Sequence, residues 1–373
     1  MEQGGVAAMT GGTGRVRVAV AGCGAVSSLY YAPALQELQR TGEVELAAVF
    51  DPDRGSAERI AAQFPGAAVA SSFDALQDAA FDLAVVASPP TLHASQSIRL
   101  LQAGRAVLCE KPMATTFADA QAMVAAAAES QALLAVGMVR RFFPAAEFIR
   151  DAIALDLLGE LRSFDLAEGS ANFGWPVASP GYFRRQQSGG GVLMDIGVHV
   201  LDLLTWWLGE PDTLGYADDA MGGIEANCLV SCTYASGLHG AVRLSRDAPL
   251  ANGFTLHGSK GWLRWSANLA DAVELGLQGS THLLAASLQR AMPARTALRA
   301  AVPAYNFEQS FVAQLRNVAR AVRGEETLRV PASDAVAAIR QLEYCYGHRS
   351  LLDMDWLDEV EVARARQLQQ AMT

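Results

Sequence analysis

Short apolar runs alternate with longer segments of helical period from residue 15 to about residue 134. The apolar runs are rich in small or β-branched residues, which is typical of strands buried on both faces of a parallel sheet. The intervening segments fit helices, because 91–104 ends at a glycine and 116–130 begins at a threonine suited to capping. This alternation predicts a doubly wound α/β domain. Its predicted strands are 15–21, 44–50, 82–88, 106–110 and 132–136.

The pattern changes after about residue 138 to longer stretches in which polar and apolar residues alternate. Such alternation predicts a mainly antiparallel sheet with one wetter face, and hence a second, α+β domain. Residues 270–303 show no clear pattern. The predicted helices of this half are 144–157, 190–208, 304–323 and 331–348, the last starting at a proline. The predicted segments are a disordered lead (1–14), the first domain (15–138), the second domain (139–348, with helix 331–348 able to pack back on the first) and a C-terminal extension (349–373).

Composition and charge narrow the class of protein. Hydrophobic residues make up 51% of the chain and charged residues 18%, which indicates a folded globular protein. The formal net charge of −10 argues against nucleic acid or an anionic membrane as a partner. We expect no membrane span, because no uninterrupted apolar stretch reaches the roughly 18 residues that one requires. Five cysteines without a C-x-x-C pair argue against a disulfide framework or a metal site, and favour a reducing cytoplasm.

The first predicted strand leads directly into a glycine motif. This motif has the form G-x-G-x-x-S and precedes a helical segment, as in a dinucleotide-binding loop. The first glycine permits a tight turn, the second lets the backbone approach a pyrophosphate, and the free N–H groups of the helix face that anion. A serine at the third position predicts slightly wider helix packing, and an ordinary strand–turn–helix corner is the alternative. The residues are Gly22, Cys23, Gly24, Ala25, Val26 and Ser27.

Asp51 follows the second predicted strand. A carboxylate there can accept hydrogen bonds from both hydroxyls of the adenosine ribose and would repel a 2′-phosphate. The sequence therefore favours NAD over NADP, although Arg54 nearby could soften the preference. The same Asp-Pro-Asp sequence is also typical of a plain turn.

Two further segments lie at carboxyl ends of predicted parallel strands. Ser88 and Pro89 end one strand, and Glu110 and Lys111 end the next. Ligands of open α/β sheets bind at this edge. A lysine beside a nicotinamide ring could exchange a proton with a substrate hydroxyl, whereas a solvated loop lysine is the alternative.

Residues 188–202 hold the densest group of candidate side chains. A glycine triplet precedes Asp195 and His199, which share a helix face because they are four positions apart. Asp202 is three positions beyond His199. A histidine between two acids could form a proton relay, since imidazole changes charge near neutral pH. An N-capping aspartate and a buried, hydrogen-bonded histidine are the alternative.

Residues 22–35, Asp51, 88–114, 137–144 and 188–209 together resemble the Gfo/Idh/MocA oxidoreductases. The resemblance covers about residues 15–348, and its E-K-P and G-G-G-x-x-x-D-x-G-x-H motifs are specific in combination. It implies a Rossmann domain followed by a domain whose open, mainly antiparallel sheet faces a partner subunit. It also implies hydride transfer between NAD(P) and a sugar, a polyol or a related alcohol.

The resemblance assigns roles to single residues. Lys111 corresponds to the cleft lysine, with Asp195 and His199 as its partners in substrate binding and proton transfer. Arg140 corresponds to a residue near the nicotinamide and the substrate. An aromatic residue or a histidine often follows the glycine loop, where this chain has Tyr30 and Tyr31. The implied cofactor-binding residues are Gly22, Cys23, Gly24, Ala25, Val26, Asp51, Ser88, Pro89, His93, Glu110, Lys111 and Arg140.

The segment before the glycine triplet offers side chains for a substrate. A flat aromatic ring and hydrogen-bonding groups suit a polyhydroxylated ring, and an interdomain or subunit contact would explain them equally well. We expect the second domain to supply them. The candidates are Asn172, Trp175, Tyr182, Arg184 and Arg185.

The expected reaction passes a hydride from the substrate carbinol to NAD while the hydroxyl proton leaves through His199 or Lys111. Spacing alone does not decide between these two groups. An NAD-dependent glycoside hydrolase of the same family and a non-catalytic nucleotide-binding protein are the alternatives. An exposed sheet face predicts a homodimer or a homotetramer.

Overall fold

A computed structural model of the chain describes residues 14–171, 176, 180–288 and 305–372. A disordered lead was predicted for residues 1–14. Residues 1–13 lie outside the described residues. The chain divides into two compact units. The first comprises Met1–Val139, Pro176–Gly189 and Glu308–Arg340, and the second comprises Arg140–Trp175, Gly190–Phe307 and Gln341–Thr373.

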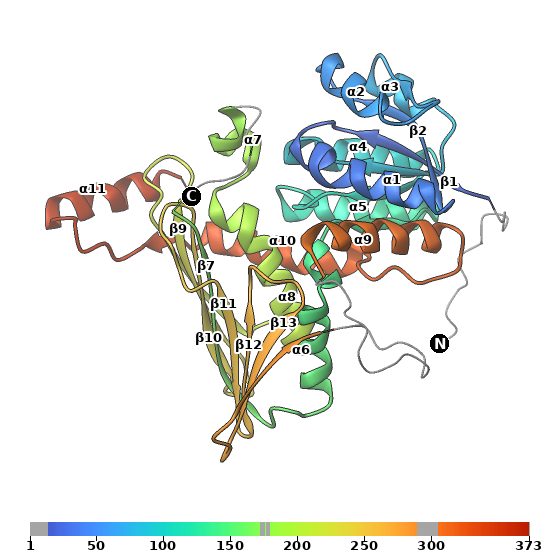
Figure 1. Ribbon diagram of the computed structural model, residues 1–373. Coiled ribbons are helices and arrows are strands. Elements are labelled where there is room, and N and C mark those ends of the chain that lie inside the picture. Colours follow the sequence, from blue (N-terminus) through green and yellow to red (C-terminus); the bar gives the residue numbers. More distant parts are fainter. Residues whose placement is uncertain (1–13, 172–175, 177–179, 289–304, 373) are drawn as a thin grey trace. The chain divides into compact units, whose positions relative to one another are not determined.

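The first unit contains a six-stranded parallel sheet in the order β3-β2-β1-β4-β5-β6. Figure 1 labels β1 and β2 of this sheet. This confirms the predicted doubly wound architecture and each predicted strand. It adds the two-residue strand β3, which is too short to have left a pattern in the sequence. The strand order reverses between β1 and β4, where ligands of such sheets bind. The strands are β1 (Val16–Ala21), β2 (Val44–Phe50), β3 (Ala68–Val69), β4 (Leu83–Val86), β5 (Ala106–Cys109) and β6 (Leu134–Val136).

Helices connect these strands and begin and end at the expected signals. The Thr116 hydroxyl accepts the N–H of Asp119 and caps α5, while Gly104 has a φ of 73° just beyond α4. The helices are α1 (Ala32–Arg40), α2 (Arg54–Ala61), α3 (Phe73–Gln77), α4 (Pro90–Gln102) and α5 (Phe117–Ser130). A π-helical turn, η1 (Ser27–Tyr31), precedes α1.

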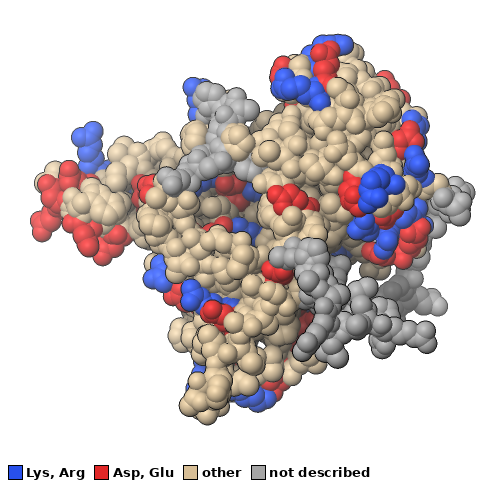
Figure 2. Space-filling model, in the orientation of Figure 1, with Lys and Arg blue, Asp and Glu red and all other residues tan. Residues whose placement is uncertain are grey.

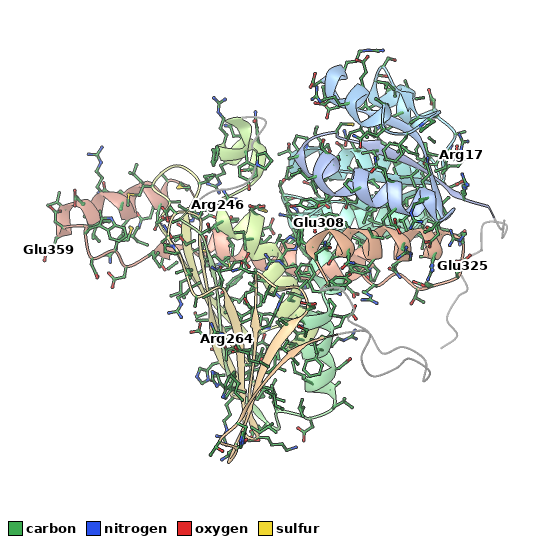
Figure 3. All side chains as sticks on the ribbon, in the orientation of Figure 1. Arg17, Arg246, Arg264, Glu308, Glu325 and Glu359 are labelled. Atoms are coloured by element: carbon green, nitrogen blue, oxygen red, sulfur yellow. The ribbon has the colours of Figure 1, made fainter. Side chains whose placement is uncertain are left out.

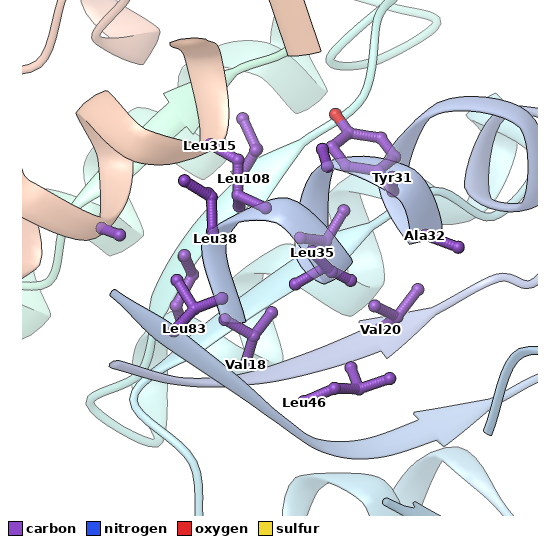
Figure 4. Packing of buried hydrophobic residues seen from close by; sticks show 14 of the residues in the cluster. Val18, Val20, Tyr31, Ala32, Leu35, Leu38, Leu46, Leu83, Leu108 and Leu315 are labelled. Atoms are coloured by element: carbon purple, nitrogen blue, oxygen red, sulfur yellow. The ribbon is translucent and has the colours of Figure 1, made fainter. Parts of the chain in front are cut away.

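The core of this unit joins segments far apart in the sequence (Figure 4). Leu35 and Leu38 of α1 pack with Leu108 of β5 and with Leu315 of α9 (Phe307–Val322). The sheet therefore buries apolar side chains not only beneath its own crossover helices but also beneath a helix from the end of the chain.

The second unit is built on a nine-stranded sheet in the order β14-β13-β12-β11-β7-β10-β9-β8-β15. The sheet is mainly antiparallel, as predicted, but β10 pairs with β7 and β15 pairs with β8 in parallel. Buried and exposed residues alternate along most strands, so one face holds the core. The strands are β7 (Leu161–Gly169), β8 (Thr213–Asp218), β9 (Asn227–Thr233), β10 (His239–Ser245), β11 (Gly253–Gly258), β12 (Gly261–Ser266), β13 (Ala272–Leu277), β14 (Leu283–Ser287) and β15 (Ser350–Leu351).

The predicted helices of the C-terminal half are present, at slightly different bounds. They are α6 (Pro144–Ala154), η4 (Leu193–Gly197) continued by α8 (Val198–Leu208), α9, and α10 (Ala332–Gly347). The structure adds η2 (Val139–Phe142), η3 (Pro180–Phe183), α7 (Arg185–Ser188) and α11 (Glu359–Gln370). The helical stretch Arg185–Leu208 is long and apolar enough to cross a membrane, but 72% of its apolar window is buried inside the protein, as in a core helix.

The C-terminal extension forms an ordered helix. The Asp358 side chain and Glu361 form a capping box at the start of α11, and acidic side chains gather there (Figure 2). These charges also suit the positive end of the helix dipole. Of the unclear segment 270–303, residues 272–277 and 283–287 form β13 and β14, and 289–304 lie outside the described residues.

Candidate active site

The glycine motif lies at the carboxyl end of β1 and closes against β4. Gly22 has a φ of 97°, and a Cβ atom there would lie 2.4 Å from the carbonyl oxygen of Ala87. A Cβ on Gly24 would meet nothing within 4 Å. Gly22 is therefore required by the fold, whereas the space above Gly24 is open to a ligand. This open backbone before a helix start fits a pyrophosphate.

Asp51 lies beside the glycine motif. Its Oδ2 atom accepts the N–H of Cys23 at 2.7 Å, and its Oδ1 atom accepts the N–H of Asp53 at 2.8 Å. These bonds fix the carboxylate at the end of β2. A carboxylate oxygen can accept more than one hydrogen bond, so Asp51 can also bind ribose hydroxyls.

Ser27, the departure at the third motif position, is completely buried. Its hydroxyl donates to the carbonyl oxygen of Gly22 at 2.6 Å, and it begins the π-helical turn η1. The structure thus has a wider helical turn at this serine, and the wider helix packing expected from it stays a prediction. Of the two tyrosines after the loop, Tyr30 stacks on Phe311 at 4.7 Å and Tyr31 is buried.

His93 connects the two strand-end segments. Its Nε2 atom lies 2.7 Å from the carbonyl oxygen of Ser88, and its Nδ1 atom lies 2.8 Å from that of Pro112. Burial lowers the pKa of the imidazole, and the charge of Lys111 acts in the same direction. The ring is 1% exposed. His93 therefore supports the crevice from inside the unit, and its influence on a cofactor passes through the segments it holds.

Glu110, next to Lys111, belongs to a buried hydrogen-bond network. The Tyr31 hydroxyl donates to its Oε1 atom at 2.6 Å, and the Lys111 N–H donates to its Oε2 atom at 2.9 Å. The Gln314 amide of α9 donates to the Tyr31 hydroxyl at 3.1 Å. Burial raises the pKa of Glu110. The network fixes the backbone from which Lys111 emerges.

In the second unit, Asp195 and His199 lie on the continuous helix formed by η4 and α8. Asp195 is in the π-helical turn and His199 is in the first turn of α8. Between them, a Cβ on Gly197 would lie 2.7 Å from Leu193 and 3.1 Å from Leu244 of β10. The glycine of the D-x-G-x-H motif thus lets this helix approach the sheet closely.

Two arginines lie near Asp195. Arg246, which is labelled in Figure 3, follows β10. It donates to the Oδ2 atom of Asp195 at 2.9 Å. Arg140 donates to both carboxylate oxygens of Glu168 at 2.7 Å. Burial alone would lower the pKa of Arg140, but the charges of Glu168 and Asp195 offset this effect and raise it. The Arg246 guanidinium therefore holds one oxygen of the Asp195 carboxyl group in place.

Asp202, the second acid of the predicted relay, is part of a buried ion pair. Its two oxygen atoms accept hydrogen bonds from Arg141 at 2.8 and 2.6 Å. Both side chains are 2% exposed. These contacts give Asp202 a structural partner, and its expected relay with His199 stays a prediction.

The predicted substrate segment is only partly described. Asn172 and Trp175 lie outside the described residues. Tyr182 lies in η3, Arg184 precedes α7 and Arg185 begins it. The segment Pro176–Gly189 belongs to the first compact unit. It lies within the range 139–348 that was predicted as the second domain.

The structure thus assembles two sets of predicted residues, one within each unit. The first contains the glycine motif, Asp51, Ser88, Pro89, Glu110 and Lys111, and the second contains Arg140, Asp195 and His199. Whether Lys111 meets Asp195 and His199 stays a prediction.

Sequence reasoning missed Glu168 and Arg246. Every second residue of a strand faces the same side of the sheet. Glu168 and Arg246 lie two positions after the buried residues Leu166 and Leu244, so both fall on the side of the core. A charged side chain on the core side needs a partner inside the protein. A charged residue at a core-facing position of the alternating pattern was therefore a signal for both residues.

Two family models match the chain. One, described as an oxidoreductase family with an NAD-binding Rossmann fold, covers residues 16–138, and the GFO/IDH/MocA C-terminal domain covers residues 147–264. The chain belongs to the Gfo/Idh/MocA oxidoreductase family. Mouse trans-1,2-dihydrobenzene-1,2-diol dehydrogenase is 30% identical over 230 residues, which are 59% of this chain and 66% of the mouse enzyme. The alignment thus spans just under two thirds of that relative.

Solved structures share the fold of this Gfo/Idh/MocA protein. Levoglucosan dehydrogenase in complex with NADH and levoglucosan has a TM-score of 0.76 at 18% identity, covering 90% of this chain and 98% of that one. KijD10, a 3-ketoreductase from Actinomadura kijaniata in complex with NADP and TDP-benzene, has a TM-score of 0.75 at 22% identity, covering 91% and 99%. The comparisons confirm the predicted family, its Rossmann domain, its oxidoreductase class and a nicotinamide cofactor.

Proposed function

We propose that this protein is an NAD-dependent dehydrogenase or reductase that acts on a CH–OH or carbonyl group of a sugar, a polyol or a related vicinal diol. The observation that carries the proposal is the arrangement within the first unit. Lys111 follows β5, the neighbour of β4, and the glycine motif closes against the end of β4. Ligands of open α/β sheets bind at this edge.

The cofactor would be held by residues of the first unit. The backbone around Gly24 and the start of the following helix would bind its pyrophosphate, and Asp51 its adenosine ribose. When bound, the nicotinamide accepts or donates the hydride. The fixed carboxylate of Asp51 favours NAD, because it would repel a 2′-phosphate.

The residues of this chain would bind the substrate and move its proton. Asp195, whose Oδ2 atom is held by Arg246, would bind and orient the substrate. The proton would pass through Lys111 or His199. We further propose that Arg140 borders the substrate, and that Tyr182 and Arg184 contribute contacts to it.

The substrate class rests on the relatives. The mouse relative is named for a dihydrodiol, and levoglucosan dehydrogenase was solved with a sugar derivative. Both names describe compounds with neighbouring hydroxyl groups. A lysine and a histidine that can each bond an oxygen would suit such a pair of hydroxyls.

The test is turnover by the purified protein. We expect NAD reduction with some member of a panel of polyols, aldoses and trans-dihydrodiols, measured as nicotinamide absorbance. Lys111→Ala should lower turnover by about 10²- to 10⁴-fold. Lys260→Ala is the matched control, since Lys260 is the other lysine of the chain and is more than half exposed.

Three results would contradict the proposal. The first is full turnover by Lys111→Ala, the second is release of sugar without net NADH, and the third is NAD binding with no compound oxidised or reduced. The second result would indicate a glycoside hydrolase, and the third a non-catalytic nucleotide-binding protein.

We also propose that the protein forms a homodimer or homotetramer through the outer face of the nine-stranded sheet. This face exposes small and charged side chains, including an ion pair between Arg243 and Asp165 at 2.9 Å. In a two-fold interface the same surface patch of each subunit meets its copy. A patch that carries both an arginine and an aspartate can therefore complement itself. Light scattering of the purified protein tests this, and a monomer would refute it. A cytoplasmic location, expected from the cysteines, completes the proposal.

A further inference from the structure

A buried carboxyl group holds the start of the helix that carries Asp195 and His199. Glu225 lies between β8 and β9 and is 1% exposed. Its Oε1 atom accepts the N–H groups of Gly191 at 2.9 Å and Leu193 at 3.1 Å, and its backbone carbonyl accepts that of Val192 at 3.1 Å. The first N–H groups of a helix have no partners within the helix. Glu225 satisfies three such groups in succession.

Tyr346, at the end of α10, fixes this carboxyl group. Its hydroxyl donates to the same Oε1 atom of Glu225 at 2.7 Å. The Arg349 guanidinium lies 5.3 Å from the centre of the Tyr346 ring and pairs with buried Asp218 at 2.9 Å. Gln369 of α11 donates to both the backbone and the carboxylate of Asp218. The C-terminal extension thus packs against the residues that hold Glu225.

This arrangement accounts for two glycines of the triplet. A Cβ on Gly190 would lie 2.1 Å from the Tyr346 hydroxyl, and one on Gly191 would lie 2.0 Å from the Glu225 carbonyl oxygen. Real Cβ atoms do not approach other atoms so closely. The absence of side chains at both positions lets Glu225 and Tyr346 reach the helix start.

We propose that Glu225 and Tyr346 are positioning residues of the active site. The N–H of Asp195 donates to the carbonyl oxygen of Gly191 at 3.1 Å, so Asp195 lies one turn beyond the residue that Glu225 holds. A shift at Gly191 would therefore move Asp195, and then His199 on the next turn. The inference rests on the proposed function, in which these two side chains bind the substrate and its proton.

The experiment compares variants that remove one group each. Glu225→Ala should lower kcat by about 10- to 100-fold, because displacements near 1 Å have effects of this size. Tyr346→Phe should lower kcat by about 3- to 10-fold, as expected for one hydrogen bond. NADH affinity should stay unchanged, since the glycine motif belongs to the other unit. Amide hydrogen exchange of residues 190–195 should accelerate in both variants.

Two controls separate positioning from general damage. Tyr344→Phe removes a hydroxyl from the same helix, but its side chain is 43% exposed, so kcat and exchange should not change. Glu225→Gln keeps the oxygen that accepts the amides and should restore most of kcat. Its new NH₂ group would replace Oε2, which accepts no hydrogen bond from the described residues.

Unchanged exchange at residues 190–195 in Tyr346→Phe and Glu225→Ala would overturn the inference. So would a normal kcat in both variants, or a Glu225→Gln variant as slow as Glu225→Ala. If the wild-type protein oxidises no alcohol, the proposed function fails, while the exchange measurement still decides whether these residues hold the helix. If Glu225→Ala does not fold, Tyr346→Phe decides alone.

Discussion

The buried ion pair between Arg141 and Asp202 allows a quantitative test of its role. Removing one member leaves the other charge buried without its partner, which costs about 3–5 kcal/mol in proteins. We therefore expect Arg141→Met and Asp202→Leu each to lower the free energy of unfolding by that amount. The double variant leaves neither charge and should recover at least half of the loss, because apolar replacements of buried pairs are often neutral.

Tryptophan fluorescence during urea unfolding measures this effect in the relevant unit. The five tryptophans among the described residues all lie in the second unit, so their signal does not mix the two units. Lys260→Met is the control, because Lys260 and Asp156 form a pair with both side chains more than half exposed. Its effect should be at most about 1 kcal/mol.

Two outcomes would refute this reasoning. The single variants could lose less than 1 kcal/mol, or the double variant could lose the sum of both. Turnover of the double variant also tests the relay expected for Asp202. If Asp202 takes part in a proton relay, a folded double variant should lose activity, because the relay requires the Asp202 carboxylate. If Asp202 only pairs with Arg141, a folded double variant should remain active.

Two further predictions concern single positions. Gly24→Ala should fold normally and lose NADH affinity, because its Cβ would enter the open space above the loop. Gly22→Ala should fold poorly, because its Cβ would collide with Ala87. Normal NADH affinity in Gly24→Ala would contradict the assignment of this loop. Burial raises the pKa of Glu225, so its contribution to the stability of the folded protein falls as the pH rises above about 4.5, the ordinary pKa of a glutamate. Glu225→Gln lacks this fall, so its stability relative to the wild type should increase as the pH rises above about 4.5, measured by urea unfolding. A constant difference would contradict the burial effect.

Much of the first unit could be predicted because its signals are local. A continuous apolar run predicts a buried parallel strand, and the next few residues determine the glycine turn and the acid at the end of β2. Ser27 also carried a local signal, although its hydrogen bond to Gly22 depends on the π-helical turn, which no sequence pattern specifies.

The contacts of the second unit could not be predicted in the same way. Glu225 and Tyr346 are 121 positions apart, and Arg141 and Asp202 are 61 apart. Their pairing depends on how the sheet and helices pack, which one sequence does not determine. The parallel pairing of β10 with β7 was missed for the same reason, since alternation predicts a strand and not its neighbour.

Each unit contains a π-helical turn shortly after a glycine motif, at Ser27–Tyr31 and at Leu193–Gly197. Such a turn holds one residue more than an α-helical turn. Deleting a single residue from either turn would therefore restore a regular helix whose two ends stay in phase, and would remove the wider turn that contains Ser27 or Asp195. Anyone who shortens these segments, or transfers them to another scaffold, has to keep that extra residue, because the backbone around Ser27 and Asp195 depends on the wider turn.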